Sequence, residues 1–226
     1  MNYKITRVGA LIAALVVILA VVTVALARDE APHDAGYSWP QQVPAASIGG
    51  AVQQLATLTV APAGDTGGFH ESAFPTWAQA RQGKACDVSQ AALLRAGSNT
   101  TTDSSCRLLT GQWQTAGDGR ILTKPADVVV VHLIPLLNAW RSGASTWGEA
   151  QRAHFANDLN SPELWVMSAD TAETRGTSTP DQWRPAEESY WCQYAANWVD
   201  VKATFHLSVA PAELAALQDM LKPCQE

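Results

Sequence analysis

An uninterrupted uncharged run, residues 8–27, lies close to the start of the chain. A helix of this length, rising 1.5 Å per residue, matches a bilayer hydrocarbon core about 30 Å thick. The apolar region of a cleaved signal peptide is shorter, about 7–15 residues, so the run favours a transmembrane anchor. Ala25-Leu26-Ala27 nevertheless has the form of a cleavage site, and a secreted product cut near Ala27 is the alternative.

The charges that flank this run orient the chain. Lys4 and Arg7 precede it, whereas Arg28 after it is followed at once by two acidic residues. Positively charged flanks stay on the cytoplasmic side, so the chain from Arg28 onward is expected to be extracytoplasmic. The predicted organisation is a cytoplasmic N-terminus (1–7), a membrane segment (8–27), a Pro-containing linker (28–46) and one extracytoplasmic domain (47–226).

The net charge of this domain excludes one broad class of function. Lys4 and Arg7 are two of the 15 basic side chains, and no acidic residue precedes Asp29. Residues 28–226 therefore hold 13 basic and 21 acidic side chains, a net charge of −8. Bulk charge does not attract so acidic a domain to nucleic acid, which we expect not to be its partner. The expected contacts are with the membrane, through residues 8–27, and with a protein partner.

Four cysteines, Cys86, Cys106, Cys192 and Cys224, follow the export signal, and none has the C-x-x-C spacing of a zinc site. Four cysteines allow three pairings. Two consecutive helical patterns, at 188–205 and 211–222, are expected to pack antiparallel, which brings Cys192 and Cys224 to the same end of a helical hairpin. The predicted disulfides are Cys192–Cys224 and, by what remains, Cys86–Cys106. Buried free thiols are the alternative.

The patterns between the cysteines mix helix and strand, which predicts an α+β fold. Helices are expected over 47–57, 87–96, 146–157, 188–205 and 211–222, and another is expected to start near Ile134–Pro135. A hairpin is expected over 106–131, with its turn at 116–119 and its end in the β-branched run 128–131. Loops are expected over 98–105 and, apart from the apolar run 164–167, over 158–185.

Residues 128–158 read VVVVHLIPLLNAWRSGASTWGEAQRAHFAND. This run resembles the core of a bacterial HNH nuclease family, the branch related to the C-terminal domain of GmrSD restriction enzymes, which also includes small secreted proteins. The branch reads roughly I-D-H-V-V-P-L-x-x-A-W-x-S-G-A-x-x-W and then R-x-x-F-A-N-D. The matching residues are His132, Pro135, Leu136, Ala139, Trp140, Ser142, Gly143, Ala144, Trp147, Arg152, Phe155, Ala156, Asn157 and Asp158. The resemblance covers about residues 50–226 and makes a bacterial source the expectation.

The resemblance implies a ββα-metal core, in which a β-hairpin and a following helix surround one divalent metal. In such a site a neutral imidazole deprotonates the attacking water. Mg²⁺ or Mn²⁺, held by oxygen ligands, stabilises charge on the leaving oxygen. By resemblance, His132 stands at the position of the base and Arg175 at that of a phosphate-binding Lys.

The chain departs from the family where the chemistry needs charge. The Asp ligand before the base is replaced by Val131, and the later Asn ligand by Ala172. The mid-motif Asn, which helps to hold the hairpin, is replaced by Glu163, and an upstream Arg by Glu71. These replacements predict a retained fold without a metal ligand or cofactor, with His132 as a relic base.

The expected function is that of a membrane-anchored, extracytoplasmic HNH-nuclease-like protein. It is expected to be catalytically inactive and to act as a binding or accessory subunit of a membrane or envelope complex, with Arg175 as a binding residue. The alternative is a secreted or anchored DNA endonuclease that uses Mg²⁺ or Mn²⁺ in a rewired site. An unrelated activity on the same scaffold is a third reading, because fold does not fix function.

Overall fold

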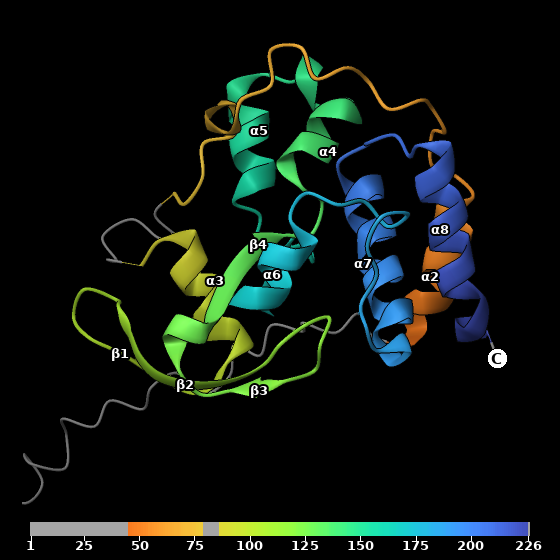
Figure 1. The fold of residues 1–226 in the computed structure, drawn as a ribbon. Helices are drawn as coiled ribbons and strands as arrows, with labels where there is room; N and C mark the ends of the chain where they lie inside the picture. Colours follow the sequence, from red (N-terminus) through yellow and green to blue (C-terminus); the bar gives the residue numbers. More distant parts are fainter. Residues whose placement is uncertain (1–44, 79–85, 226) are drawn as a thin grey trace, which may run out of the picture. The chain divides into compact units, whose positions relative to one another are not determined.

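Helices and strands are interspersed along the chain, which gives an α+β fold (Figure 1). The computed structural model describes residues 45–78 and 86–225, all of them within one contact unit, Ser38–Glu226. The helices are α2 (Ala45–Leu55), α3 (Val88–Ala96), α4 (Leu136–Arg141), α5 (Glu149–Ala156), α6 (Ala169–Arg175), α7 (Trp191–Thr204) and α8 (Pro211–Leu221). The strands are β1 (Ser98–Thr102), β2 (Leu108–Gln114), β3 (Ile121–Leu122), β4 (Val128–His132) and β5 (Leu164–Ser168).

The predicted membrane segment, 8–27, and most of the predicted linker lie outside the described residues. Among the residues that are described, no helix has the length and hydropathy needed to span a bilayer.

The strands form two small antiparallel sheets. One has the order β1-β2-β3, and the other consists of β4 and β5. In the second sheet Val128 pairs with Ser168 at one end and His132 with Leu164 at the other. Residues 133–163, which include α4 and α5, therefore leave the sheet after His132 and return just before Leu164.

The expected hairpin over 106–131 is correct in its first part and wrong in its last. β2 and β3 pair around the turn at 116–119, but β4 pairs with β5 instead of continuing that hairpin. The physical reason is burial, because every residue of β5 is buried. A strand buried on both faces lacks the alternating pattern that would identify it, and sequence analysis gave it no partner.

Two expected loops also contain regular structure. Residues 98–102 form β1, an exposed strand of polar and β-branched residues that pairs with β2. Residues 164–175 form β5 and then α6 without an intervening loop. Polar composition suggested loops in both places, but β-branched threonines suit an exposed strand and Ala169–Arg175 forms a short solvent-facing helix.

The expected helices are present, with small differences in their ends. The first, α2, starts at Ala45, inside the expected linker, and α4 starts at Leu136 directly after Pro135. Helix α3 begins with a capping box. The Asp87 carboxylate accepts a hydrogen bond from the backbone N–H of Gln90, and Gln90 Oε1 accepts one from the backbone N–H of Asp87. Helices α7 and α8 form the expected hairpin, and α2 packs against both.

Both predicted disulfides are present. Cys192–Cys224 joins the start of α7 to the segment after α8, and Cys86–Cys106 joins the residues that precede α3 and β2. Their sequence separations, 20 and 32 residues, correspond to about 3–4 kcal/mol of stabilisation each by loop-closure entropy.

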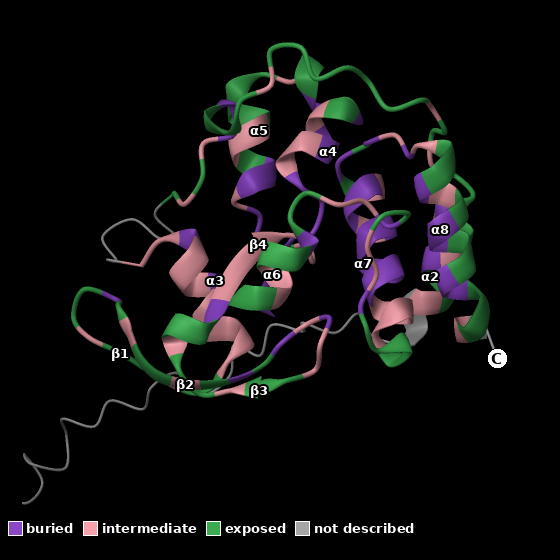
Figure 2. Cartoon of the chain, in the orientation of Figure 1, coloured by how far each residue is buried: buried purple, intermediate pink, exposed green. Residues whose placement is uncertain are grey.

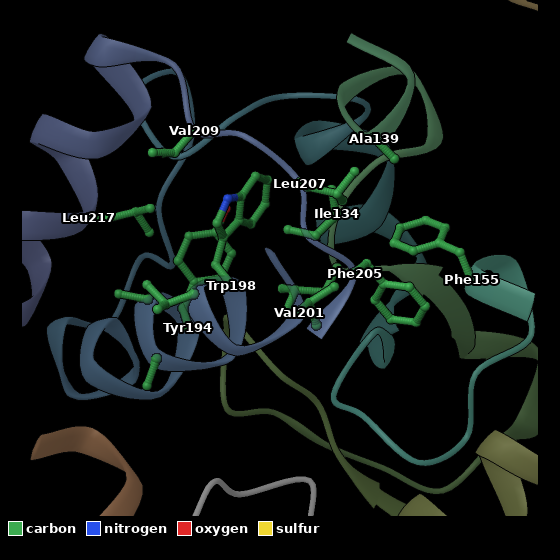
Figure 3. Packing of buried hydrophobic residues seen from close by; sticks show 14 of the residues in the cluster. Ile134, Ala139, Phe155, Tyr194, Trp198, Val201, Phe205, Leu207, Val209 and Leu217 are labelled. Carbon is green, nitrogen blue, oxygen red and sulfur yellow. The ribbon is translucent and has the colours of Figure 1, made fainter. Parts of the chain in front are cut away.

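The main core lies among the helices. Buried residues make up much of α7 and one face of α8 (Figure 2), and Tyr194, Leu207 and Leu217 lie around Trp198 (Figure 3). Phe155 and Phe205 pack edge to face with ring centroids 5.0 Å apart, the preferred geometry for such a pair. This core fixes the start of the 133–163 excursion, because Leu133 and Ile134 are fully buried in it.

A charged side chain also lies in this core. Lys202 on α7 is completely buried, and its Nζ lies 2.9 Å from the Glu213 carboxylate of α8. The same Nζ donates to Asn138 Oδ1 (2.8 Å), Ser142 Oγ (2.7 Å) and the Ser208 carbonyl (2.8 Å). Lys202 therefore links α4, α7 and α8, and its hydrogen bonds offset part of the cost of burying the ion pair.

Candidate functional site

The site that the sequence predicts lies where β4 ends. His132 is the last residue of β4, and α6 follows the partner strand β5 directly. Helix α6 contacts both strands. The order is therefore strand, antiparallel strand and helix, with the base position at the end of the first strand and Ala172 and Arg175 on the helix.

His132 is held by a ring stack and a hydrogen bond. Its imidazole lies parallel to the Trp77 indole, with ring centroids 5.2 Å apart and an interplanar angle of 7°. His132 Nε2 lies 3.0 Å from the Ala156 carbonyl oxygen. Because a carbonyl only accepts, the proton is assigned to Nε2, and Nδ1 keeps its lone pair.

The electrostatics keep this imidazole neutral. Burial lowers the pKa of His132 to about 4; the hydrogen bond to Ala156 acts in the opposite direction, and the Arg175 charge adds to the lowering. At neutral pH the ring is therefore an unprotonated acceptor at Nδ1, but a weakly basic one. A general base works best with a pKa near the operating pH, which this imidazole does not have.

Arg175 lies beside His132 but uses its donors on the backbone. Nη1 donates to the His132 carbonyl (3.0 Å) and Nη2 to the Leu133 carbonyl. The side chain is buried, and its guanidinium lies 5.8 Å from the centre of the Trp183 ring. This arrangement fixes the end of β4 to α6. It leaves Arg175 poorly placed for the phosphate contact that the family resemblance implies.

The two predicted ligand positions do not suit a divalent cation. Val131 lines the pocket described below with an apolar side chain, and Ala172 lies one helical turn before Arg175 on α6. Within residues 45–78 and 86–225, no group of three or more His, Cys, Asp or Glu side chains could hold a metal ion. Hard cations need oxygen ligands, and neither Val131 nor Ala172 offers one from its side chain.

Glu163 ties the two ends of the 133–163 excursion together. Its Oε2 accepts from the Ile134 amide (3.1 Å), and its backbone carbonyl accepts from the Leu133 amide (2.6 Å). The side chain is completely buried, and burial raises the pKa of Glu163 well above its ordinary value. The side chain and backbone carbonyl of Glu163 thus hold the start of the excursion against the start of β5.

A segment far away in sequence completes the site. Residues 69–77 form one wall of a pocket of about 620 Å³, and the end of β4, the start of α4 and the end of α6 form the rest. Glu71 and His132, both identified from the sequence, line this same pocket. The lining residues are Phe69, Glu71, Ser72, Phe74, Pro75, Thr76, Trp77, Val131, His132, Pro135, Leu136, Leu137, Arg175, Gly176 and Thr177.

Arg152 in α5 and Asn157 directly after it hold this wall in place. Asn157 Nδ2 donates to the Pro75 carbonyl (2.7 Å), and its Oδ1 accepts from the Ala78 amide (2.9 Å). Arg152 Nε donates to the Ala73 carbonyl (2.8 Å). Trp77, between these contacts, has a φ of 24°, an uncommon value for a residue with a side chain. The roles of Arg152 and Asn157 were not predicted from the sequence, although both lie in the R-x-x-F-A-N-D match, which was a usable signal.

The turn between β2 and β3 positions α6. The Asp118 carboxylate accepts hydrogen bonds from the hydroxyls of Thr115, Ser168 and Thr171, and so joins the turn to the first residues of α6. Burial alone would raise the pKa of Asp118, but these hydrogen bonds outweigh it and the pKa is lowered. A charged Asp118 thus fixes the helix that carries Ala172 and Arg175.

Comparison with known proteins gives one informative result. No family model matches the chain, and no solved structure matches it. A protein of Arthroderma benhamiae, described as an uncharacterized secreted protein, is 38% identical over 185 residues, which cover 82% of this chain and 89% of the relative. This relative is fungal, so it gives no support to the expectation of a bacterial source.

Identity at this level over most of both chains is evidence of common descent. The chain belongs to the same family as this secreted protein of Arthroderma benhamiae.

Proposed function

We propose that this protein is a degenerate HNH nuclease-like module that no longer cuts DNA and acts through binding. The observation that carries the proposal is the replacement of both ligand positions, by Val131 and Ala172, around a His132 that keeps its place at the end of β4. Without oxygen ligands at these positions, a cation would have to lose water against apolar side chains, which is costly.

The element order supports the HNH part of the proposal. A strand ending in the base position, an antiparallel partner strand and a helix that follows at once is the arrangement expected of a ββα core. The 133–163 excursion separates the two strands in sequence without separating them in space.

Charge supports the loss of nuclease activity. Glu71 lines the pocket at a position where the family has an Arg, and Arg175 is engaged with backbone carbonyls. With a net charge of −8 on residues 28–226, the domain repels a polyanion at long range rather than attracting it.

We place the domain outside the cytoplasm. Two disulfides form in oxidising compartments, and the relative is described as secreted. Residues 8–27 either anchor the chain as a single-pass membrane protein or are removed by cleavage near Ala27. In either form, the proposed role is that of a binding or accessory subunit of a membrane or envelope complex.

The test is a nicking assay on supercoiled plasmid with Mg²⁺ or Mn²⁺, using the full-length chain beside its His132→Ala variant. We expect no metal-dependent nicking above a buffer control from either protein. EDTA-sensitive nicking that His132→Ala abolishes would instead establish the alternative, a metal-dependent endonuclease with a rewired site.

A further inference from the structure

The pocket beside His132 has the size and the walls of a small-molecule site. Its volume, about 620 Å³, falls within the usual range of about 300–1,000 Å³ for such sites. The aromatic rings of Phe69, Phe74 and Trp77 line it, together with Pro135 and Leu136. The pocket is open to solvent on one side, and a ligand in it would contact both apolar and polar lining residues.

The charge that a ligand can reach is negative. Among the described residues that line the pocket, Glu71 and Arg175 are the acidic and basic side chains. Arg175 is only 3% exposed, and both of its terminal nitrogens donate to backbone carbonyls. Glu71 is exposed, and no ion pair with another described residue engages its carboxylate.

The His132 imidazole, which lines the pocket, has one ring nitrogen that can accept a hydrogen bond. His132 donates through Nε2 to Ala156, which leaves Nδ1 as an acceptor. Aromatic faces attract cations through their negative quadrupole, by about 0.5–2 kcal/mol. The accessible carboxylate of Glu71 and the partly exposed rings of Phe69 and Trp77 therefore favour a positively charged ligand over an anion.

We propose that this pocket binds a small organic cation, with its ammonium group at Glu71 and its apolar part against the aromatic walls. The inference rests on the proposed function, because it gives the pocket of a former nuclease a ligand of opposite charge to a phosphodiester. The proposed ligand is a free small molecule, because a pocket of about 620 Å³ has room for little more.

Calorimetric titration of the full-length chain in a maltoside detergent tests the proposal with three probes. Choline is the cation, 3,3-dimethylbutan-1-ol is its neutral isostere, and inorganic phosphate is the anion. We expect saturable choline binding that is at least about tenfold tighter than binding of the isostere, and no phosphate binding.

Two variants locate the effect. Glu71→Gln should weaken choline binding about tenfold and remove the preference over the isostere, because it removes the accessible charge. Glu149→Gln, a matched change at an exposed position of α5 outside the pocket, should leave binding unchanged.

Absence of choline binding, equal affinity for the isostere, phosphate binding or an inert Glu71→Gln change would overturn the inference. If the supercoiled plasmid is still not nicked, such a result does not affect the proposal that nuclease activity is lost. Metal-dependent nicking, by contrast, would remove the proposed function on which the inference rests.

Discussion

Two ionisable residues mark the ends of the 133–163 excursion, and burial favours the neutral form of both. The pKa of His132 is lowered to about 4, and that of Glu163 is raised well above its ordinary value. An active metal site would instead surround its base with charged ligands and water. The burial of both groups is the residue-level observation that agrees with the proposal of a site without a metal.

Replacing Glu163 by Gln should change how stability depends on pH. Burial makes the pKa of Glu163 higher in the folded state than in the unfolded state. Its contribution to the free energy of unfolding is therefore fully present below about pH 4.5, where both states are protonated. This contribution is lost as the pH rises from there through the folded-state pKa. Over this window we expect the wild type to lose up to about 1.4 kcal/mol per pH unit relative to Glu163→Gln.

Urea unfolding between pH 4 and 8 measures this difference. Glu187→Gln, a change of the same chemistry at an exposed residue, serves as the control. Parallel pH profiles for the wild type and Glu163→Gln would show that Glu163 is charged in the folded protein, contrary to this account.

At the scale of elements, the wall formed by residues 69–77 has little regular structure of its own. Apart from a short 3₁₀ turn, Glu71–Ala73, its position depends on the hydrogen bonds from Arg152 and Asn157. Helix α5 therefore acts on the site in two ways, directly through the Ala156 carbonyl that accepts from His132 and indirectly through the wall.

Asn157→Ala should release the wall and expose His132. We expect the pKa of His132 to rise from about 4 toward 6.5, since loss of the Trp77 stack rehydrates the imidazole. Stability should fall by about 1–2 kcal/mol as the contacts to Pro75 and Ala78 are lost. NMR titration of the imidazole measures the pKa.

A control separates this effect from general destabilisation. Gln151→Ala changes an exposed residue of the same helix and should leave the His132 titration in place. An Asn157→Ala variant that is destabilised but keeps the pKa of His132 near 4 would contradict the role given to the wall.

Local signals predicted the helices well and the strand pairing poorly. Pro211 at the start of α8 and the leucine spacing after it act within one or two turns, so the sequence shows them directly. The partner of β4 could not be predicted this way, because β5 is a short, fully buried strand that residues 133–163 separate from β4. The resemblance singled out His132 as a candidate site residue, but no sequence pattern indicates that Trp77 stacks on it.

At the scale of the whole molecule, the buried Lys202–Glu213 pair connects the helical hairpin to α4 and so to the segment that begins at the site. The pair lies inside the largest core, where Trp198 also donates to Glu213. Desolvation of such a pair offsets much of its attraction, so it contributes more to the fixed packing of these helices than to net stability.

Lys202→Met should be strongly destabilising, by about 3–5 kcal/mol, because it leaves Glu213 charged and buried without its partner. The double change Lys202→Met with Glu213→Leu should recover part of that loss, since it removes both charges. Denaturant unfolding measures the two variants. A double variant less stable than Lys202→Met alone would mean that Glu213 is needed mainly for its bonds to Trp198 and Ala210.

The central claim, that an HNH-like arrangement has lost its metal, is tested most directly by Mn²⁺ titration of the full-length chain, followed by electron paramagnetic resonance. The account predicts the spectrum of the free aqua ion throughout the titration, with no saturable bound fraction. It also predicts that Val131→Asp with Ala172→Asn introduces a measurable bound fraction. Stoichiometric Mn²⁺ binding by the wild type that disappears in His132→Ala would contradict the claim.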